Sequence, residues 1–118
     1  MILGYINSKP TTKIYKQKKI KIERYVNNFD FADIRFITER NRHQLIHTTK
    51  QNEPYLFITN TFEEIGKSPT DVAELIISIL NLDIQFVIIQ NDIYFNIDTK
   101  HIVYPTVFEY FRAKYSDK

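Results

Sequence analysis

The chain has 118 residues, of which 43% are hydrophobic and 14% aromatic, so it is long enough for one domain with a buried core and too apolar to be disordered. It contains no cysteine, which excludes disulfides and thiolate metal sites, and its two glycines are too few for a turn-rich all-β fold. The net charge of +2 permits contact with nucleic acid without requiring it.

The first two predicted elements are a buried strand and a basic helix. Residues 2–6 form a compact apolar run, which is typical of a central parallel strand covered on both faces. Residues 11–28 have helical periodicity, with an apolar face that carries Ile22 and Val26. The basic residues of this helix are Lys13, Lys16, Lys18, Lys19, Lys21 and Arg24.

Two more strands are predicted on either side of a polar segment. Residues 33–38 have the apolar, β-branched and aromatic composition of a strand. Residues 39–51 are mostly polar, and we expect a short helix there. Pro54 breaks that helix, and residues 55–59 form a third apolar run of the buried-strand type.

A strong helix start follows the third strand. Ser68 is a preferred N-cap residue, Pro69 suits the first helical position, and Asp71 places a negative charge in the first turn. The helix is predicted to continue to about Asn81. Its apolar face carries Val72, Leu75, Ile76, Ile79 and Leu80.

The remaining predicted elements are two strands and a helix that starts at Pro105. Residues 84–89 are a fourth buried strand, whereas residues 93–97 alternate apolar with polar and predict a strand at the sheet edge. Regular alternation of strands and helices predicts a three-layer α/β fold with a mostly parallel sheet of four to five strands. We expect one domain over residues 1–118.

Four short motifs resemble, in their order along the chain, the catalytic domain of the serine recombinases, the resolvase and invertase family. They are Gly4-Tyr5-Ile6-Asn7-Ser8-Lys9, Thr38-Glu39-Arg40, Phe62-Glu63-Glu64-Ile65-Gly66-Lys67 and Ile97-Asp98-Thr99. The resemblance implies a resolvase-like, Rossmann-like fold. It also implies DNA strand exchange, in which a serine attacks a phosphodiester and arginines hold the phosphate.

This chain departs from the family at the residues that would carry the chemistry. In a gap-free comparison the nucleophilic serine falls on Lys9, with Ser8 one residue early, and the first arginine falls on Asn7. The two arginines of the third motif fall on Glu64 and Lys67. Arg42 matches a family arginine if a short deletion is placed before it. The candidate catalytic residues, as vestiges of the family site, are therefore Ser8, Arg42 and Lys67.

Three functional hypotheses follow. The first is a resolvase/invertase-like domain related to site-specific DNA recombination that is catalytically inactive and acts as an association or accessory module. The second is an active minimal serine recombinase that uses Ser8. The third is an unrelated α/β regulatory domain with a weak anion site.

Partner predictions come from the C-terminal helix and the basic helix. The C-terminal aromatic residues either pack on the chain's own sheet or form a homodimer; they are Tyr104, Phe108, Phe111 and Tyr115. The lysine-rich helix either contacts a DNA phosphate backbone or is simply solvated. A longer recombinase is a further candidate partner.

No cofactor, metal or membrane contact is predicted. Glycine is too scarce for a phosphate-binding loop, and His43 and His47 lie one helical turn apart without an obvious third metal ligand. The sequence has neither signal-peptide character nor an apolar run of membrane-spanning length. We therefore expect a cytoplasmic protein.

Overall fold

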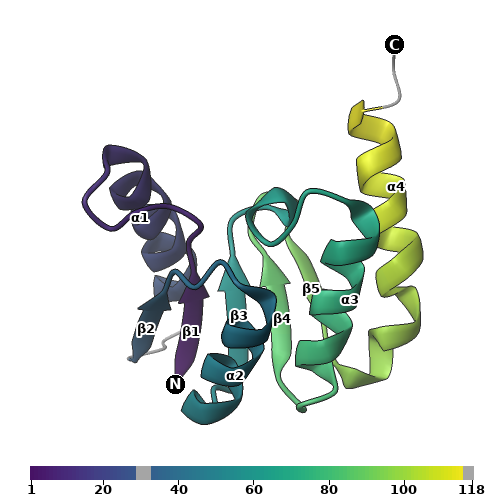
Figure 1. The fold of residues 1–118 in the computed structure, drawn as a ribbon, viewed down its shortest axis with the longest axis horizontal. Coiled ribbons are helices and arrows are strands. Elements are labelled where there is room, and N and C mark those ends of the chain that lie inside the picture. Colours follow the sequence, from purple (N-terminus) through teal and green to yellow (C-terminus); the bar gives the residue numbers. More distant parts are fainter. Residues whose placement is uncertain (29–32, 116–118) are drawn as a thin grey trace.

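Five strands form one sheet in the computed structural model, which describes residues 1–28 and 33–115. Their order across the sheet is β2-β1-β3-β4-β5 (Figure 1). The strands are β1 (Ile2–Tyr5), β2 (Ile34–Ile37), β3 (Leu56–Thr59), β4 (Gln85–Ile88) and β5 (Ile93–Phe95). The first four run parallel and β5 pairs with β4 in the antiparallel direction, which confirms the predicted mostly parallel sheet.

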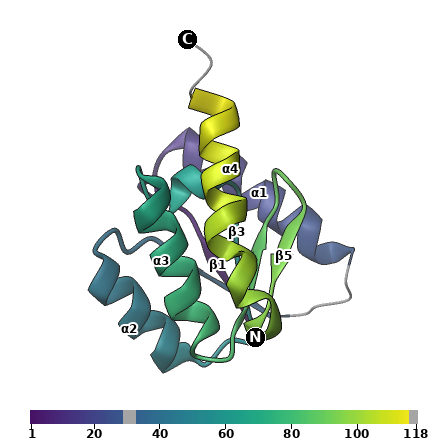
Figure 2. The same ribbon diagram turned by 90° about the vertical axis from the view of Figure 1, so that its right-hand side faces the viewer.

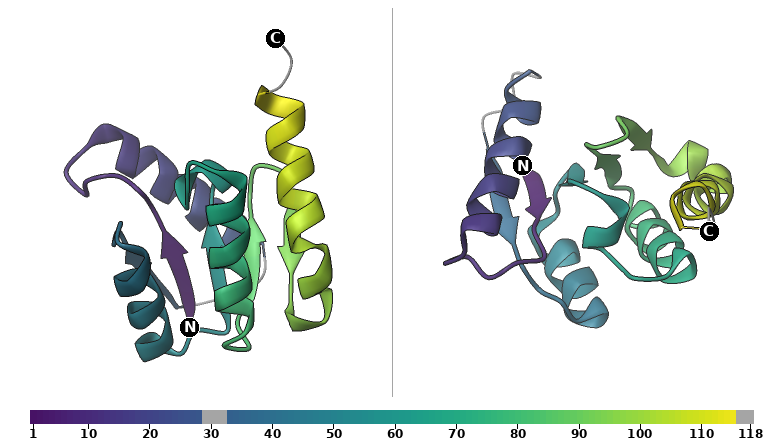
Figure 3. Two further views of the ribbon diagram at one scale, coloured as in Figure 1. Left: turned by 45° about the vertical axis from the view of Figure 1, so that its right-hand side comes forward. Right: turned by 90° about the horizontal axis from the view of Figure 1, so that it is seen from above.

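Helices cover both faces of the sheet and make the three predicted layers (Figure 3). The α-helices are α1 (Lys13–Asn27), α2 (Arg42–Asn52), α3 (Pro69–Leu80) and α4 (Val103–Tyr115), and short 3₁₀ helices are η1 (Phe62–Glu64) and η2 (Ile97–Ile102). Helix α1 alone packs on one face, whereas α2, α3 and α4 cover the other (Figure 3). None of the helices in the described ranges is long and apolar enough to cross a bilayer.

Two apolar cores hold the layers together. The smaller one joins the buried side chains Ile22 and Val26 of α1 to the sheet, as the helical periodicity predicts. The larger one contains Phe57 and Phe86, whose stacked rings have centroids 4.9 Å apart. The sheet is therefore buried on both faces at its centre, which explains why the central strands read as continuous apolar runs.

Gly4 is required where β1 lies beside β2 and beneath α1. A Cβ atom at this position would lie 2.9 Å from Cδ1 of Phe36 and 3.5 Å from Cγ2 of Ile22. Even a methyl group would have to displace the Phe36 ring, whereas its distance to Ile22 is an ordinary contact. The glycine thus allows the strand and the helix layer to approach closely.

The helix starts differ from the predicted ones in two places. Helix α2 begins at Arg42 rather than at residue 39, because the Asn41 side chain caps it by accepting from the Gln44 amide at 3.2 Å. Helix α4 begins at Val103 rather than at Pro105, since it continues directly from η2. Proline is tolerated there because the amides of the first turn have no intrahelical acceptor.

Other boundaries agree more closely. The Ser68 hydroxyl accepts from the Asp71 amide at 3.1 Å, which confirms the predicted N-cap of α3. The predicted strand over residues 93–97 ends at Phe95, because Asn96 caps η2 through the Thr99 amide at 3.1 Å.

The aromatic stripe predicted for the C-terminal helix is divided between two faces of α4. Phe111 is only 7% exposed and packs inward with Val103 and Val107, whereas Tyr104, Phe108 and Tyr115 are 40 to 49% exposed. Figures 1 and 2 show α4 lying alongside α3 at the edge of the molecule. The buried face of α4 therefore begins with Val103 and Val107, each one residue before the predicted Tyr104 and Phe108. The two valines let α4 pack closely against α3.

Candidate functional site

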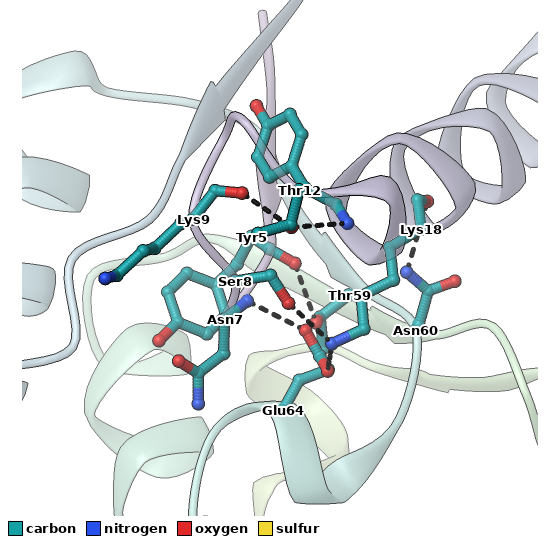
Figure 4. A network of polar contacts seen from close by, with 10 residues as sticks. Tyr5, Asn7, Ser8, Lys9, Thr12, Lys18, Thr59, Asn60 and Glu64 are labelled. Atoms are coloured by element: carbon teal, nitrogen blue, oxygen red, sulfur yellow. Dashed lines mark hydrogen bonds and ion pairs between the residues drawn. The ribbon is translucent and has the colours of Figure 1, made fainter.

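The loop that follows β1 lies at the carboxyl end of the parallel strands, where open α/β sheets commonly bind ligands. Thr12 fixes this loop to the start of α1. Its hydroxyl donates to the Lys9 carbonyl at 2.7 Å and accepts from the Tyr15 amide at 3.2 Å (Figure 4). Ser8 is held within this short segment and is half-buried.

Glu64 reaches this loop from η1, the turn that follows β3. It is 8% exposed, and its Oε2 atom accepts from the Asn7 amide at 2.8 Å. Its Oε1 atom forms an ion pair with Lys18 Nζ of α1 at 2.5 Å. A carboxylate this deeply buried requires such partners, because an unpaired charge would carry a large desolvation cost.

Lys18 connects this ion pair to Ser8. Its Nζ donates to Ser8 Oγ at 3.0 Å, so one ammonium group contacts both the hydroxyl and the Glu64 carboxylate (Figure 4). The lysine is itself anchored, because its carbonyl accepts from Asn60 Nδ2 at 3.2 Å. An ammonium group has only donors, so Lys18 orients the Ser8 hydroxyl but does not accept its proton.

Tyr5 forms the floor of the site rather than a reactive group. Its ring is 2% exposed and stacks on Phe57 with a centroid distance of 6.0 Å. Burial, and then the nearby charge of Glu64, raises the pKa of Tyr5 to about 12. The phenol therefore stays neutral at physiological pH, and the Gly4-Tyr5 motif contributes structure.

The three residues predicted from the sequence are not joined in one contact network. Ser8 contacts Lys18, whereas Arg42 of α2 pairs with Glu74 of α3 at 3.1 Å and both side chains are exposed. Lys67, which follows η1 in the chain, is exposed. Within residues 1–28 and 33–115, no hydrogen bond or ion pair links Ser8 to Arg42 or Lys67.

Sequence reasoning missed the two residues that contact the Ser8 segment, Lys18 and Glu64. The helical period places Lys18 at the margin of the inward face of α1, which is a weak signal that it could turn inward. The resemblance places Glu64 where the family has an arginine at the site, but it did not predict burial, because adjacent acids at positions 63 and 64 are usually solvated. Burial of Glu64 depends on contacts with β1 and α1 that are distant in the sequence.

Glu63, the neighbouring acid, points to a different part of the molecule. Its carboxylate accepts hydrogen bonds from Tyr110 at 2.9 Å and from Tyr115 at 2.5 Å, and it pairs with Lys114 at 2.7 Å. Burial alone would raise the pKa of Glu63, but the hydrogen bonds from Lys114 and Tyr115 outweigh it and lower that pKa to about 2. Glu63 therefore anchors α4 and does not form an acid–base pair with Glu64.

The described residues do not form a metal centre. In the two described ranges, no three His, Asp or Glu side chains are placed together to hold an ion. His43 and His47 therefore have no third ligand there. The arrangement at the carboxyl end of the parallel strands is a serine hydroxyl, a cation and a buried carboxylate.

The sheet order and the helices on both faces define the fold of a serine recombinase catalytic domain. The chain is similar to the solved N-terminal catalytic domain of TP901-1 integrase, with a TM-score of 0.67 and 10% sequence identity over 96% of this chain and 95% of that one. No protein-family profile matches the chain, and no curated protein sequence does. The likeness confirms the predicted resemblance at the level of the fold.

Proposed function

We propose that the chain is a resolvase/invertase-like domain that serves site-specific DNA recombination without catalysing strand exchange. The observation that carries this proposal is the Lys18–Glu64 ion pair, 2.5 Å long, beside Ser8. Phosphoryl transfer to a serine needs cations that remain free to neutralise the phosphate. Here the cation that contacts Ser8 is already paired with a carboxylate.

Electrostatics also oppose the binding of a phosphodiester at Ser8. Glu64 lies at the position where the family resemblance places an arginine, which reverses the sign of the charge. Two unit negative charges about 5 Å apart repel by about 3 kcal/mol at an effective dielectric constant of 20. Lys18 offsets this repulsion, so a phosphate at Ser8 would meet an ion pair that offers no net positive charge, and Arg42, which pairs with Glu74, is engaged elsewhere.

The exposed side of α4 supports a role in association. Tyr104, Phe108 and Tyr115 are each at least 40% exposed, and exposed apolar patches of this kind mark interaction sites. On this proposal the face pairs two copies of the chain, or pairs one copy with a longer recombinase that reads DNA. Phe111, which is buried, takes no part in it.

A covalent-adduct experiment tests the absence of catalysis. The protein is incubated with supercoiled plasmid, the mixture is denatured, and protein-linked DNA is collected on a filter. We expect wild type and Ser8→Ala to give the same background. An adduct formed by wild type and absent from Ser8→Ala would overturn the proposal.

The second candidate function is an active minimal recombinase, and the Ser8–Lys18 contact of 3.0 Å favours it. In this case Lys18 orients the Ser8 hydroxyl toward the phosphorus atom. A Ser8-dependent adduct that is also lost in Lys18→Met would support this reading. Adduct formation unaffected by Lys18→Met would remove the orienting role of Lys18, and the absence of any Ser8-dependent adduct would remove this candidate function.

A further inference from the structure

Positive charge is concentrated in one segment of the chain. Seven of the sixteen lysines and arginines lie between Lys9 and Arg24, together with one of the fourteen acids, Glu23. This segment therefore carries a formal charge of +6, and the rest of the chain carries −4. The modest overall charge of +2 hides this asymmetry.

Helix α1 presents most of these cations on its outer face. It stands alone on its side of the sheet (Figures 1 and 3), with Ile22 and Val26 turned inward. The outward cations are Lys13, Lys16, Lys21 and Arg24, all exposed. Within the described part of the chain, none of these four side chains forms a hydrogen bond or an ion pair with another residue.

We infer that the outer face of α1 binds the phosphate backbone of a nucleic-acid duplex without reading its sequence. The four cations span about 17 Å of helix at a rise of 1.5 Å per residue. A duplex carries one negative charge per 1.7 Å of its axis, so several phosphates lie within reach of such a face. The charges on α1 are complementary to this partner.

The side chains of α1 favour a duplex over a single strand. Binding to single strands relies on aromatic side chains that stack on unpaired bases. The two tyrosines of α1 are half-buried in the smaller core, and the Tyr25 hydroxyl donates to Asp92 at 3.1 Å. The outer face offers cations and no aromatic platform.

The same face does not suit a membrane surface. A membrane-bound amphipathic helix needs a continuous apolar stripe, and α1 uses its stripe to pack on the sheet. The exposed apolar residues are Ile14, 57% exposed, and Ile20, 45% exposed. They lie roughly 120° apart around the helix, so they do not form a second stripe.

This surface is separate from the features behind the proposed function. Lys18 turns toward Glu64, and Lys19 lies over the Phe36 ring with its Nζ 5.2 Å from the centroid. Neither belongs to the outer face, and α4 lies at the other end of the sheet (Figure 1). Duplex binding by α1 therefore requires neither a competent Ser8 nor self-association.

Fluorescence anisotropy with a labelled 20-base-pair DNA duplex tests the inference, at salt concentrations from 25 to 200 mM. Four phosphate contacts predict a slope of log K against log salt of about −3.6. The double variant Lys13→Gln/Arg24→Gln should bind at least 10-fold more weakly at 50 mM salt, with a slope of about −1.8. All these positions are exposed, so folding should not change.

The matched control is Lys50→Gln/Lys100→Gln, which removes the same net charge from exposed positions on α2 and η2. It should keep the wild-type slope. If both double variants weakened duplex binding equally, the effect would come from the net charge of the protein alone, and the assignment to α1 would be overturned. Tighter binding to a single strand of equal length, or to phosphatidylserine vesicles, would also overturn it.

Discussion

Replacing Glu64 by alanine should destabilise the protein more than any change to an exposed ion pair. The substitution leaves the Asn7 amide without its acceptor at 2.8 Å and removes the partner of Lys18. A hydrogen bond to a charged group contributes about 1.5–3 kcal/mol. Breaking a fully buried pair costs about 3–5 kcal/mol, but the Lys18 side chain is 24% exposed and regains some water, so we expect about 2–3 kcal/mol.

Urea unfolding followed by circular dichroism measures this loss. With a slope of about 1–3 kcal/mol/M for a small domain, the unfolding midpoint of Glu64→Ala should fall by about 0.7–3 M. Glu64→Gln keeps an acceptor for Asn7 and should lose about 1 kcal/mol. The control is Glu74→Ala, whose pair with Arg42 is exposed and contributes less than about 1 kcal/mol. Equal, small shifts for Glu64→Ala and Glu74→Ala would refute the reasoning.

Three further predictions concern packing, pH and association. Gly4→Ala should lower the free energy of unfolding in urea by about 1–3 kcal/mol, since its Cβ would lie 2.9 Å from the Phe36 ring; an unchanged midpoint would contradict this. The pKa of Glu63 is lowered to about 2, so its stabilising contribution is complete above pH 4.5 and disappears as the pH falls toward 2. Glu63→Gln should therefore be less stable than wild type above pH 4.5, and the difference should shrink as the pH falls toward 2. In size-exclusion chromatography wild type should elute as a dimer and Phe108→Glu as a monomer, whereas a monomeric wild type would discard the α4 interface.

Most of the fold could be predicted from the sequence because its signals are local. Continuous apolar runs mark β1, β3 and β4, which are covered on both faces, and the Ser68 cap marks the start of α3. The direction of β5 was not predicted, although it follows from a short connection. The four residues between Ile88 and Ile93 allow a hairpin but are too few for a parallel crossover.

The inward face of α4 was harder to predict because two adjacent lines of apolar residues run along the helix. One line contains Val103 and Val107, and the other contains Tyr104 and Phe108. Side-chain size alone favours the aromatic line for burial. Close packing against α3 instead selects the valines, and Phe111 lies where both lines meet.

The position of the candidate site could be predicted, but its chemistry could not. Ser8 lies where expected, at the carboxyl end of the parallel strands, because it directly follows β1. Lys18 and Glu64 come from α1 and η1, and no local pattern couples a lysine in one element to an acid in the other. Predicting their contact requires the three-dimensional arrangement of β1, α1 and η1.

The proposed function gives the departures from the recombinase motifs a common physical explanation. Arginine in place of Glu64 would bring a second cation close to Lys18, so such a site would need a bound anion to balance both charges. Glu64 supplies that negative charge from within the chain, and the Asn7 amide and Lys18 hold its two oxygens. The site is therefore neutralised without phosphate, so the residue that balances the charge of Lys18 within the chain also disfavours a DNA substrate.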